Sequence, residues 1–272
     1  MNTKVSVIIP IYNKEKYIGK CIDSLLLQDY GELEIVAVND GSSDDTAAVL
    51  ERYGDKIKLI TTENRGVASA RNTGLENATG GLILFLDADD YYEQNTVRDL
   101  VKRQAETGAD ILRFGYRIIL PDGNVKLPAD PFTHNVKIEK DEFKKYVYPY
   151  FINGIMLNSV CLAMYKKSCI DGLRFREDMK TAEDAVFNLD AYTNAQSTVF
   201  LSDIYYCYVR SRGSLTGSGL SLAEKYKDNF TFSDEIRKRL DIWGLNSVHW
   251  RIKAYMRPFF LTFDKIFRKL GL

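Results

Sequence analysis

The sequence contains few of the residues that form metal clusters and disulfide frameworks. Its 272 residues include only two histidines and four cysteines, and no two cysteines form a CxxC pair. Such wide spacing disfavours a structural zinc site and a disulfide-stapled scaffold, so reduced thiols in a cytosolic protein are expected. The cysteines are Cys21, Cys161, Cys169 and Cys207.

The sequence also lacks an excess of charge of either sign and lacks a long apolar run. It has 37 Lys and Arg residues against 37 Asp and Glu residues. A neutral chain produces no overall field that attracts nucleic acid, so no nucleic-acid partner is expected. No stretch approaches the roughly 20 apolar residues of a membrane span. The N-terminal run that ends at Ile11 is typical of a buried strand and not of a secretion signal. These features predict a cytoplasmic location.

The sequence does contain an alternation of short apolar runs and helical patterns over about its first 110 residues. This alternation predicts βαβ units and a parallel sheet. The predicted strands are Val5–Ile11, Glu34–Val38, Ile57–Thr61 and Leu82–Leu86. The predicted helices are Glu15–Gln28, a segment from the turn at 40–43 to Tyr53, and a segment from about Gly66.

The pattern changes beyond Gly108. A longer strand is predicted over Asp110–Leu120, followed by a Pro121-Asp122-Gly123 turn. Residues 128–150 are predicted to be irregular and then partly helical. Later strands are predicted at Val160–Tyr165 and Thr198–Val209, and helices at Glu183–Asn194 and over the C-terminal part of the chain.

Three carboxylates follow the predicted strand 82–86 directly. Asp87, Asp89 and Asp90 lie within four residues, and open α/β sheets bind their ligands beyond such strand ends. The carboxylates repel one another unless a cation is near. A hard divalent cation would bind them through oxygen and bridge to phosphates. A helix N-terminus capped by aspartate is the alternative, but three acids after an apolar strand favour metal and phosphate binding.

Two other strand ends carry polar groups whose roles stay open. Asp40 could accept hydrogen bonds from a nucleobase, while Ser42 or Ser43 could cap the following helix and Asp45 could favour its first turn. In the segment 64–72, Arg71 could neutralise a phosphate or pin an aspartate. A surface arginine on a helix needs no such explanation.

The segments around Asp184 and Arg210 are equally ambiguous. Thr181 followed by Asp184 is similar to a capping box, and the spacing alone favours that structural interpretation. The functional interpretation is a carboxylate that accepts a proton from an attacking hydroxyl. The segment 210–217 mixes cations, hydroxyls and glycines, and is either a lid over a diphosphate or an ordinary basic loop.

Taken together and in this order, these segments resemble the inverting glycosyltransferases of family 2, which have the GT-A fold. The resemblance is dense over residues 4–92 and sparser to about residue 216. The matching stretches are VSVIIPIYN (5–13), YIGKCIDSLLLQ (17–28), EIVAVNDGSSDDT (34–46), ENRGVASARNTGL (63–75), ATGGLILFLDADD (78–90) and AEDAVF (182–187).

The resemblance implies an α/β fold with a Rossmann-like, mainly parallel central sheet flanked by helices, and a helical C-terminal extension. Residues 1–216 would form the catalytic domain, with a nucleotide-binding half at 1–110 and an acceptor half at 111–216. Residues 217–272 would form the helical region.

The resemblance also implies a role for each matching residue. Donor-binding positions would be Pro10, Ile11, Tyr12, Asp40, Asn64, Arg71, Asp87, Ala88, Asp89, Arg210 and Ser214. Within this set Asp40 would bind a uracil-type base, and Asp89 with Asp87 would hold Mn²⁺ or Mg²⁺. Asp184, with Glu183 as its neighbour, would be the catalytic base.

The implied activity is transfer of a hexosyl or N-acetylhexosaminyl group, with inversion, from a nucleotide sugar. A UDP-sugar is the expected donor, a saccharide or lipid-linked saccharide the acceptor, and cell-surface polysaccharide synthesis the process. One alternative is an inactive nucleotide-sugar-binding protein. A DxD phosphotransferase is a weaker one, because Tyr91 and Tyr92 replace the Thr or Val that aspartate-nucleophile phosphatases carry there.

The C-terminal segment 251–272 interleaves apolar and basic residues. It is predicted either to lie on an anionic membrane surface as an amphipathic helix or to pack on the core with its basic side in water. The first alternative would place the protein peripherally on the inner face of the plasma membrane.

Overall fold

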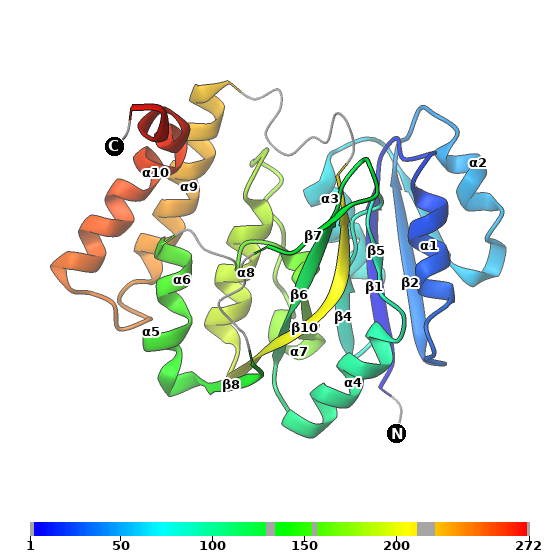
Figure 1. The fold of residues 1–272 in the computed structure, drawn as a ribbon, viewed down its shortest axis with the longest axis horizontal. Coiled ribbons are helices and arrows are strands. Elements are labelled where there is room, and N and C mark those ends of the chain that lie inside the picture. Colours follow the sequence, from blue (N-terminus) through cyan, green and yellow to red (C-terminus); the bar gives the residue numbers. More distant parts are fainter. Residues whose placement is uncertain (1–2, 129–133, 154–156, 211–220, 271–272) are drawn as a thin grey trace.

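The structure is a computed structural model that describes residues 3–128, 134–153, 157–210 and 221–270, with side chains described as far as residue 259 (Figure 1). One mixed sheet runs through the molecule, in the order β3-β2-β1-β4-β9-β6-β10-β5. In the described part of the chain, β7 pairs with β6 and β8 pairs with β10 outside this path. The strands are β1 (Val5–Ile11), β2 (Leu33–Asp40), β3 (Lys58–Thr62), β4 (Leu82–Phe85), β5 (Tyr91–Tyr92), β6 (Ile111–Ile119), β7 (Val125–Lys126), β8 (Val136–Glu139), β9 (Ala163–Lys166) and β10 (Ser197–Val209).

Helices cover both faces of this sheet. The described helices are α1 (Ile18–Leu26), α2 (Thr46–Glu51), α3 (Val67–Asn77), α4 (Thr96–Thr107), α5 (Phe143–Tyr146), α6 (Tyr148–Asn153), α7 (Lys167–Ile170), α8 (Glu183–Asn194), α9 (Leu222–Arg239) and α10 (Val248–Leu270). Short 3₁₀ turns occur at Gly54–Lys56, Lys140–Glu142 and Val160–Leu162. In Figure 1, α1 lies in front of the sheet and α3 behind it. This follows from right-handed crossovers that run first outward from β1 to β3 and then back to β4.

The four N-terminal strands pair in parallel, and their order reverses between β1 and β4. All seven residues of β1 are buried, as expected for a central strand with helices on both sides. The strand order therefore creates a topological switch point at the carboxyl end of β1, where open α/β sheets bind ligands.

The second half of the sheet combines antiparallel and parallel pairs. β9 runs antiparallel to both β4 and β6, whereas β6 and β10 are parallel. The four N-terminal strands and the β6–β10 pair are parallel, so the predicted, mainly parallel central sheet is confirmed. β1 and α8 have the predicted bounds.

Some predictions for this half were wrong. The strand predicted at Val160–Tyr165 begins with a 3₁₀ turn over Val160–Leu162 and becomes β9 only at Ala163. The segment predicted to be irregular contains β8, in which Ile138 is buried between the exposed Lys137 and Glu139. A single buried residue between charged neighbours gives no apolar run, and β8 forms because β10 supplies a pairing edge.

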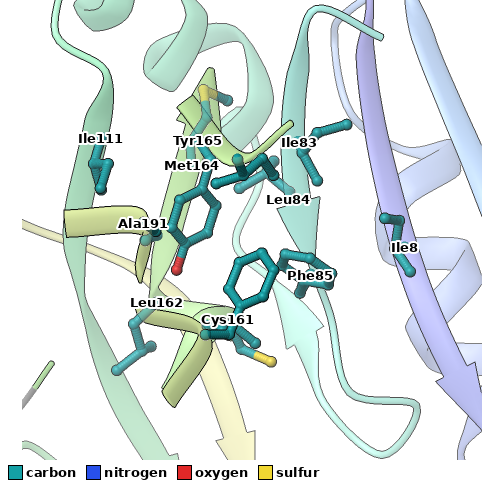
Figure 2. Close-up of a cluster of buried hydrophobic side chains, with 14 of the residues drawn as sticks. Ile8, Ile83, Leu84, Phe85, Ile111, Cys161, Leu162, Met164, Tyr165 and Ala191 are labelled. Atoms are coloured by element: carbon teal, nitrogen blue, oxygen red, sulfur yellow. The ribbon is translucent and has the colours of Figure 1, made fainter. Parts of the chain in front are cut away.

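Aromatic rings join the two halves of the sheet. Figure 2 shows Phe85 of β4 facing Tyr165 of β9 within the buried cluster, and their ring centroids lie 6.1 Å apart with an edge-to-face geometry. The ring centroid of Phe187 in α8 lies 5.9 Å from that of Phe85. The Phe187 ring also stacks on the Phe175 ring, with 4.2 Å between their centroids. This cluster fixes α8, and therefore its first turn, relative to the end of β4. All four cysteines are buried and free.

Close contact between α3 and β1 leads to a stability prediction. A Cβ atom added at Gly74 of α3 would lie 2.2 Å from Ile8 Cγ2. Because Ile8 is buried in a close-packed sheet, the Gly74→Ala variant is expected to lose about 1–3 kcal/mol of unfolding free energy. Urea denaturation measures this loss.

The matched control is Gly19→Ala in α1, where the added Cβ would meet only the Tyr53 hydroxyl at 3.6 Å. Alanine is favoured over glycine inside helices by about 0.5–1 kcal/mol, so this variant should match or exceed the native stability. Equal stabilities of the two variants would contradict the packing argument.

The predicted helical C-terminal region is confirmed. α9 begins with a capping box in which the Ser221 side chain and Glu224 bind each other's backbone N–H groups. α10 packs along α9 (Figure 1). Within the described residues, no helix combines the length and the apolar character needed to cross a membrane.

Candidate functional site

A cavity of about 420 Å³ opens at the switch point, where the loops after β1, β2, β3 and β4 meet. It gathers most of the residues that the sequence singled out. Those that line it are Pro10, Ile11, Tyr12, Asp40, Asn64, Arg71, Asp87, Ala88, Asp89 and Glu183. These residues come from separate motifs, and the parallel strands bring them together because their carboxyl ends share one edge of the sheet.

Asp40 holds the turn that precedes α3. Its side chain is buried, with 2% exposure, and its two carboxylate oxygens accept the backbone N–H groups of Arg65 at 2.9 Å and Gly66 at 2.8 Å. Gly66 precedes α3 with a φ of 93°, a conformation that suits glycine. An ionised carboxylate has acceptor capacity beyond these two bonds, so a contact with a nucleobase N–H stays a prediction.

The serines after Asp40 do not cap the next helix, so that alternative is excluded. α2 begins only at Thr46, its N-cap residue Asp45 makes no side-chain capping bond, and Asp44 Oδ1 accepts the Thr46 N–H at 3.1 Å. The Ser42 hydroxyl instead accepts the Asn13 N–H at 3.0 Å, and Asn13 Oδ1 accepts the Ser43 N–H at 2.8 Å. These bonds join the loop after β1 to the loop after β2. The turn at residues 42–43 therefore stabilises the wall of the cavity and not the start of α2.

Arg71 connects two acidic motifs that are distant in the sequence. One guanidinium nitrogen lies 2.7 Å from Glu183 of α8, and the other lies 3.2 Å from Asp87 at the end of β4. Burial by itself would lower the pKa of Arg71, but Asp87 and Glu183 outweigh it and raise that pKa. The sequence left two roles open for Arg71. The structure shows one of them, an ion pair that holds the Asp87 carboxylate in place. Its contact with a phosphate stays a prediction.

The three aspartates after β4 separate into two groups. Asp87 and Asp89 line the cavity, and Asp89 pairs with Lys14 Nζ at 2.6 Å. Asp90 is buried with 2% exposure, accepts the Val209 N–H at 2.7 Å and hydrogen-bonds with the Tyr206 hydroxyl. Burial, and then the nearby Asp87 carboxylate, raise the pKa of Asp90 to about 8. Asp90 therefore joins β10 to the turn formed by residues 87–89, called the DxD turn below, and is absent from the described cavity lining.

Asp87 and Asp89 suit a divalent cation that is shared with phosphates. Their side chains are 39% and 23% exposed, and carboxylate oxygens are the ligands that Mg²⁺ and Mn²⁺ prefer. No cluster of three or more metal-binding side chains occurs among the described residues. A metal held here would take these two carboxylates from the protein and its other ligands from substrate phosphates and water. The Lys14 ammonium against Asp89 shows that this position attracts positive charge.

Asp184 lies in the first turn of α8, but not in a capping box. The residue before the helix is Ala182, with a φ of 63° and no capping side chain. The Thr181 N–H and hydroxyl both donate to Asp228 of α9, each at 2.9 Å. The capping-box interpretation was therefore wrong, because α9 supplies Thr181 with a partner from 47 residues further along the chain.

The environment of Asp184 changes its acidity. Asp184 is partly buried, and its carboxylate accepts the Ala185 N–H at 2.8 Å. Burial, and then the neighbouring Glu183 charge, raise the pKa of Asp184 to about 7. A carboxyl group with this pKa can accept a proton near neutral pH. Glu183 lines the cavity, whereas Asp184, the next residue in the sequence, is absent from the described lining.

The donor contacts predicted for Arg210 and Ser214 stay predictions. Arg210 is exposed, its backbone N–H donates to the Ile119 carbonyl at 2.8 Å, and its side chain is outside the described cavity lining. Ser214 lies outside the described residues. β10 contributes Tyr208 to the lining instead.

Lys14 and Tyr208 are lining residues that the sequence reasoning missed. The sequence does carry a signal for Lys14, because it is a polar residue three positions after the end of β1, where open α/β sheets bind ligands. Tyr208 carries no comparable signal, since Tyr205 and Tyr206 lie in the same strand and have the same side chain.

Comparison with known proteins identifies the family. Residues 6–173 match the model described as Glycosyl transferase family 2. The chain belongs to glycosyltransferase family 2. Glycosyltransferase GlyA of Streptococcus pneumoniae is 32% identical to it over 222 residues, which cover 79% of this chain and 32% of GlyA. TarS of Staphylococcus aureus, a poly(ribitol-phosphate) beta-N-acetylglucosaminyltransferase, is 33% identical over 77% of this chain and 36% of TarS. The chain thus spans about a third of the length of these two family relatives.

Solved structures of similar proteins confirm the GT-A fold. TarS residues 1–349 in complex with UDP-GlcNAc match this family 2 chain with a TM-score of 0.72 and 29% identity, over 85% of this chain and 66% of that chain. The mannosyltransferase PcManGT from Pyrobaculum calidifontis, solved with GDP-Man and Mn²⁺, has a TM-score of 0.63 at 20% identity, over 95% and 71% of the two chains. PcManGT shares the fold with this chain.

Proposed function

We propose that this family 2 glycosyltransferase moves a hexosyl or N-acetylhexosaminyl group from a UDP-sugar to a hydroxyl of a saccharide or lipid-linked saccharide, with inversion. One observation supports the proposal most strongly: the cavity at the switch point joins a buried base-binding candidate, Asp40, to the two acids Asp87 and Asp89. The similarity to TarS, whose structure holds UDP-GlcNAc, favours uridine over other bases. Cell-surface polysaccharide synthesis is the proposed process.

The donor would lie across the strand ends, with the base near Asp40 and the diphosphate near the DxD turn. Pro10, Ile11, Tyr12 and Asn64 would surround the nucleoside. Tyr12 is 45% exposed at the cavity, so its ring is accessible for stacking on a base. Arg71 would keep the Asp87 carboxylate in place and contribute positive charge beside the phosphates.

Asp87 and Asp89 would hold Mn²⁺ or Mg²⁺. Such a cation offsets the charge that develops on a departing diphosphate. Lys14 would then exchange its present partner, Asp89, for a phosphate oxygen, because the cation and the ammonium compete for one carboxylate.

The transfer itself would be a single displacement. Asp184 accepts the proton of the acceptor hydroxyl, and the hydroxyl oxygen forms a bond to the anomeric carbon while the bond from that carbon to the diphosphate oxygen breaks. UDP leaves with the bonding electrons, and the anomeric configuration inverts because attack and departure occur on opposite faces of the sugar.

The donor assignment has a direct test. Thermal-shift measurements with a panel of nucleotide sugars, each with and without Mn²⁺, should give the largest stabilisation for a UDP-sugar with metal. UDP release from the same donor then separates the transferase from an inactive binding protein. Stabilisation without any UDP release on addition of saccharide acceptors would favour the binding protein.

The pKa of Asp184 leads to a prediction for the pH dependence. Only the ionised carboxylate can accept the acceptor proton, so kcat/KM should fall about tenfold per pH unit below a pKa of about 7 and level off above it. Initial rates over a pH series at saturating metal measure the profile. A profile that is flat from pH 5 to pH 8 would contradict the assignment of Asp184.

We also propose which parts of the chain bind the donor and the acceptor. Residues 1–110 would bind the donor and residues 111–216 the acceptor, with the helical region 217–272 as an extension.

A further inference from the structure

The two C-terminal helices leave a row of large apolar side chains in solvent. On α9, Tyr226 and Phe230 are 40% and 45% exposed; on α10, Ile252, Tyr255 and Phe259 are 57%, 67% and 43% exposed. These five side chains are called the apolar stripe below. Single exposed apolar residues are ordinary, but a contiguous group marks an interaction surface.

The spacing places the α10 part of the stripe on one side of the helix. Residues 252, 255 and 259 are three or four apart, which is the separation of neighbours on one helix face. Ala254 and Arg257 are buried on the opposite side, with 0% and 4% exposure. α10 therefore packs on the protein through one face and presents a second apolar face outward. Packing on the core accounts for only the first of these faces.

One arginine joins the α9 and α10 parts of the stripe. The Arg237 guanidinium lies 5.0 Å from the centre of the Phe230 ring and 4.6 Å from the centre of the Tyr255 ring. Phe230 also lies beside Tyr226, with 6.3 Å between their ring centres. The stripe is thus a continuous surface across two helices.

Positive charge accompanies the outward face of α10. From Val248 to Phe259 the sequence has three Lys or Arg residues and no Asp or Glu, and two of the three, Arg251 and Lys253, are exposed. On a helical projection they flank residues 252–259 on either side. Arg251 pairs with exposed Asp241 at 2.9 Å, an interaction that water weakens.

We propose that the apolar stripe lies on an anionic lipid membrane, with the aromatic and aliphatic side chains among the acyl chains and Arg251 and Lys253 at the headgroups. Aromatic and aliphatic side chains flanked by lysine and arginine suit this interface because the charges remain with the phosphates while the rings leave water. In Figure 1, α9 begins at the end of the molecule that holds the carboxyl ends of β1 and β4, whereas α10 begins lower, at the side of the molecule. If the proposed function is correct, the same membrane would also hold a lipid-linked acceptor.

Vesicle flotation of the full chain tests the proposal. The native protein should float with vesicles of phosphatidylcholine and phosphatidylglycerol, and much less with phosphatidylcholine alone. The triple variant Ile252→Ser, Tyr255→Ser, Phe259→Ser should bind the anionic vesicles more than about tenfold more weakly. Charge reversal in Arg251→Glu with Lys253→Glu should weaken binding by at least about fivefold for each residue. The matched control is Leu27→Ser, which removes a 74% exposed leucine at the end of α1, far along the chain from the stripe, and should bind as the native protein does.

Two further measurements make the outcome decisive. UDP binding should be unchanged in the stripe variant, because the three side chains are outside the described cavity lining. The melting temperature should fall only slightly, because the three side chains are exposed and Tyr255 loses only its contact with Arg237. A failure of UDP binding in the native protein would count against the proposed function alone. Equal flotation of native and stripe variants would overturn the membrane proposal, as would a native dimer that the stripe variant converts to monomer without losing vesicle binding.

Discussion

Replacing Asp184 by asparagine is expected to lower the turnover of sugar transfer by about 10²–10⁴-fold, the usual contribution of a general base. Asparagine keeps the size of the side chain and can still accept the Ala185 N–H. It cannot accept the proton of the acceptor hydroxyl at neutral pH. UDP affinity should stay within about threefold of the native value, because Asp184 is outside the described cavity lining.

The control for this prediction is Asp190→Asn, the same substitution six residues further along α8. Asp190 lies in the second half of α8 and pairs with Arg239 of α9. This variant therefore tests whether the loss of a carboxylate on α8 lowers turnover only by destabilising the helix. Turnover of Asp190→Asn should remain close to native. Near-native turnover of Asp184→Asn would show that another group takes the proton, and an equal loss in both variants would point to α8 stability.

Asp89→Asn is expected to remove the metal dependence of donor binding. The variant loses one of the two carboxylates that line the cavity at the DxD turn, and a neutral amide is a much weaker ligand for a hard cation. Turnover should fall by about 10²–10³-fold, the size of effect that follows from losing one group that stabilises transition-state charge. Calorimetric titration of UDP, with and without Mn²⁺, should show no gain from the metal.

Lys14→Met separates this effect from the ion pair. Lys14 is the partner of Asp89 at 2.6 Å, and its removal frees that carboxylate for a metal. Mn²⁺ should therefore still strengthen UDP binding in Lys14→Met, and Mn²⁺ alone should bind more tightly than to the native protein. If Lys14→Met and Asp89→Asn both abolished the metal effect, the pair itself and not metal ligation by Asp89 would be the important interaction.

Much of the site was predictable because it lies at strand ends. An apolar run of four to seven residues followed by polar residues identified the ends of β1, β2 and β4, and parallel pairing ensures that such ends share one edge. Asp40, Asp87 and Asp89 were found in this way. Lys14 also follows the end of β1 as a polar residue, whereas Tyr208 has no feature that distinguishes it within an aromatic strand.

Local patterns failed where the partner of a side chain comes from a distant element. Thr181 and Asp184 have the spacing of a capping box, yet the Thr181 hydroxyl donates to Asp228 of α9. Ser42 and Ser43 precede a helix, yet they bond to Asn13 in the loop after β1. Hydrogen-bonding side chains take the partner that packing brings nearest, and a short sequence window does not contain that partner.

The sequence by itself determined the class of fold, the family and the order of the strand-end motifs, because hydrophobic period and turn chemistry are local properties of the chain. Only the tertiary structure decided how the acids are used. It placed Arg71 between Asp87 and Glu183, although Glu183 is 112 residues from Arg71 in the sequence. It also buried Asp90 and left Asp87 and Asp89 at the cavity. Ionisation and exposure depend on the charges and packing that surround a group in space, and those neighbours are set by the folded sheet.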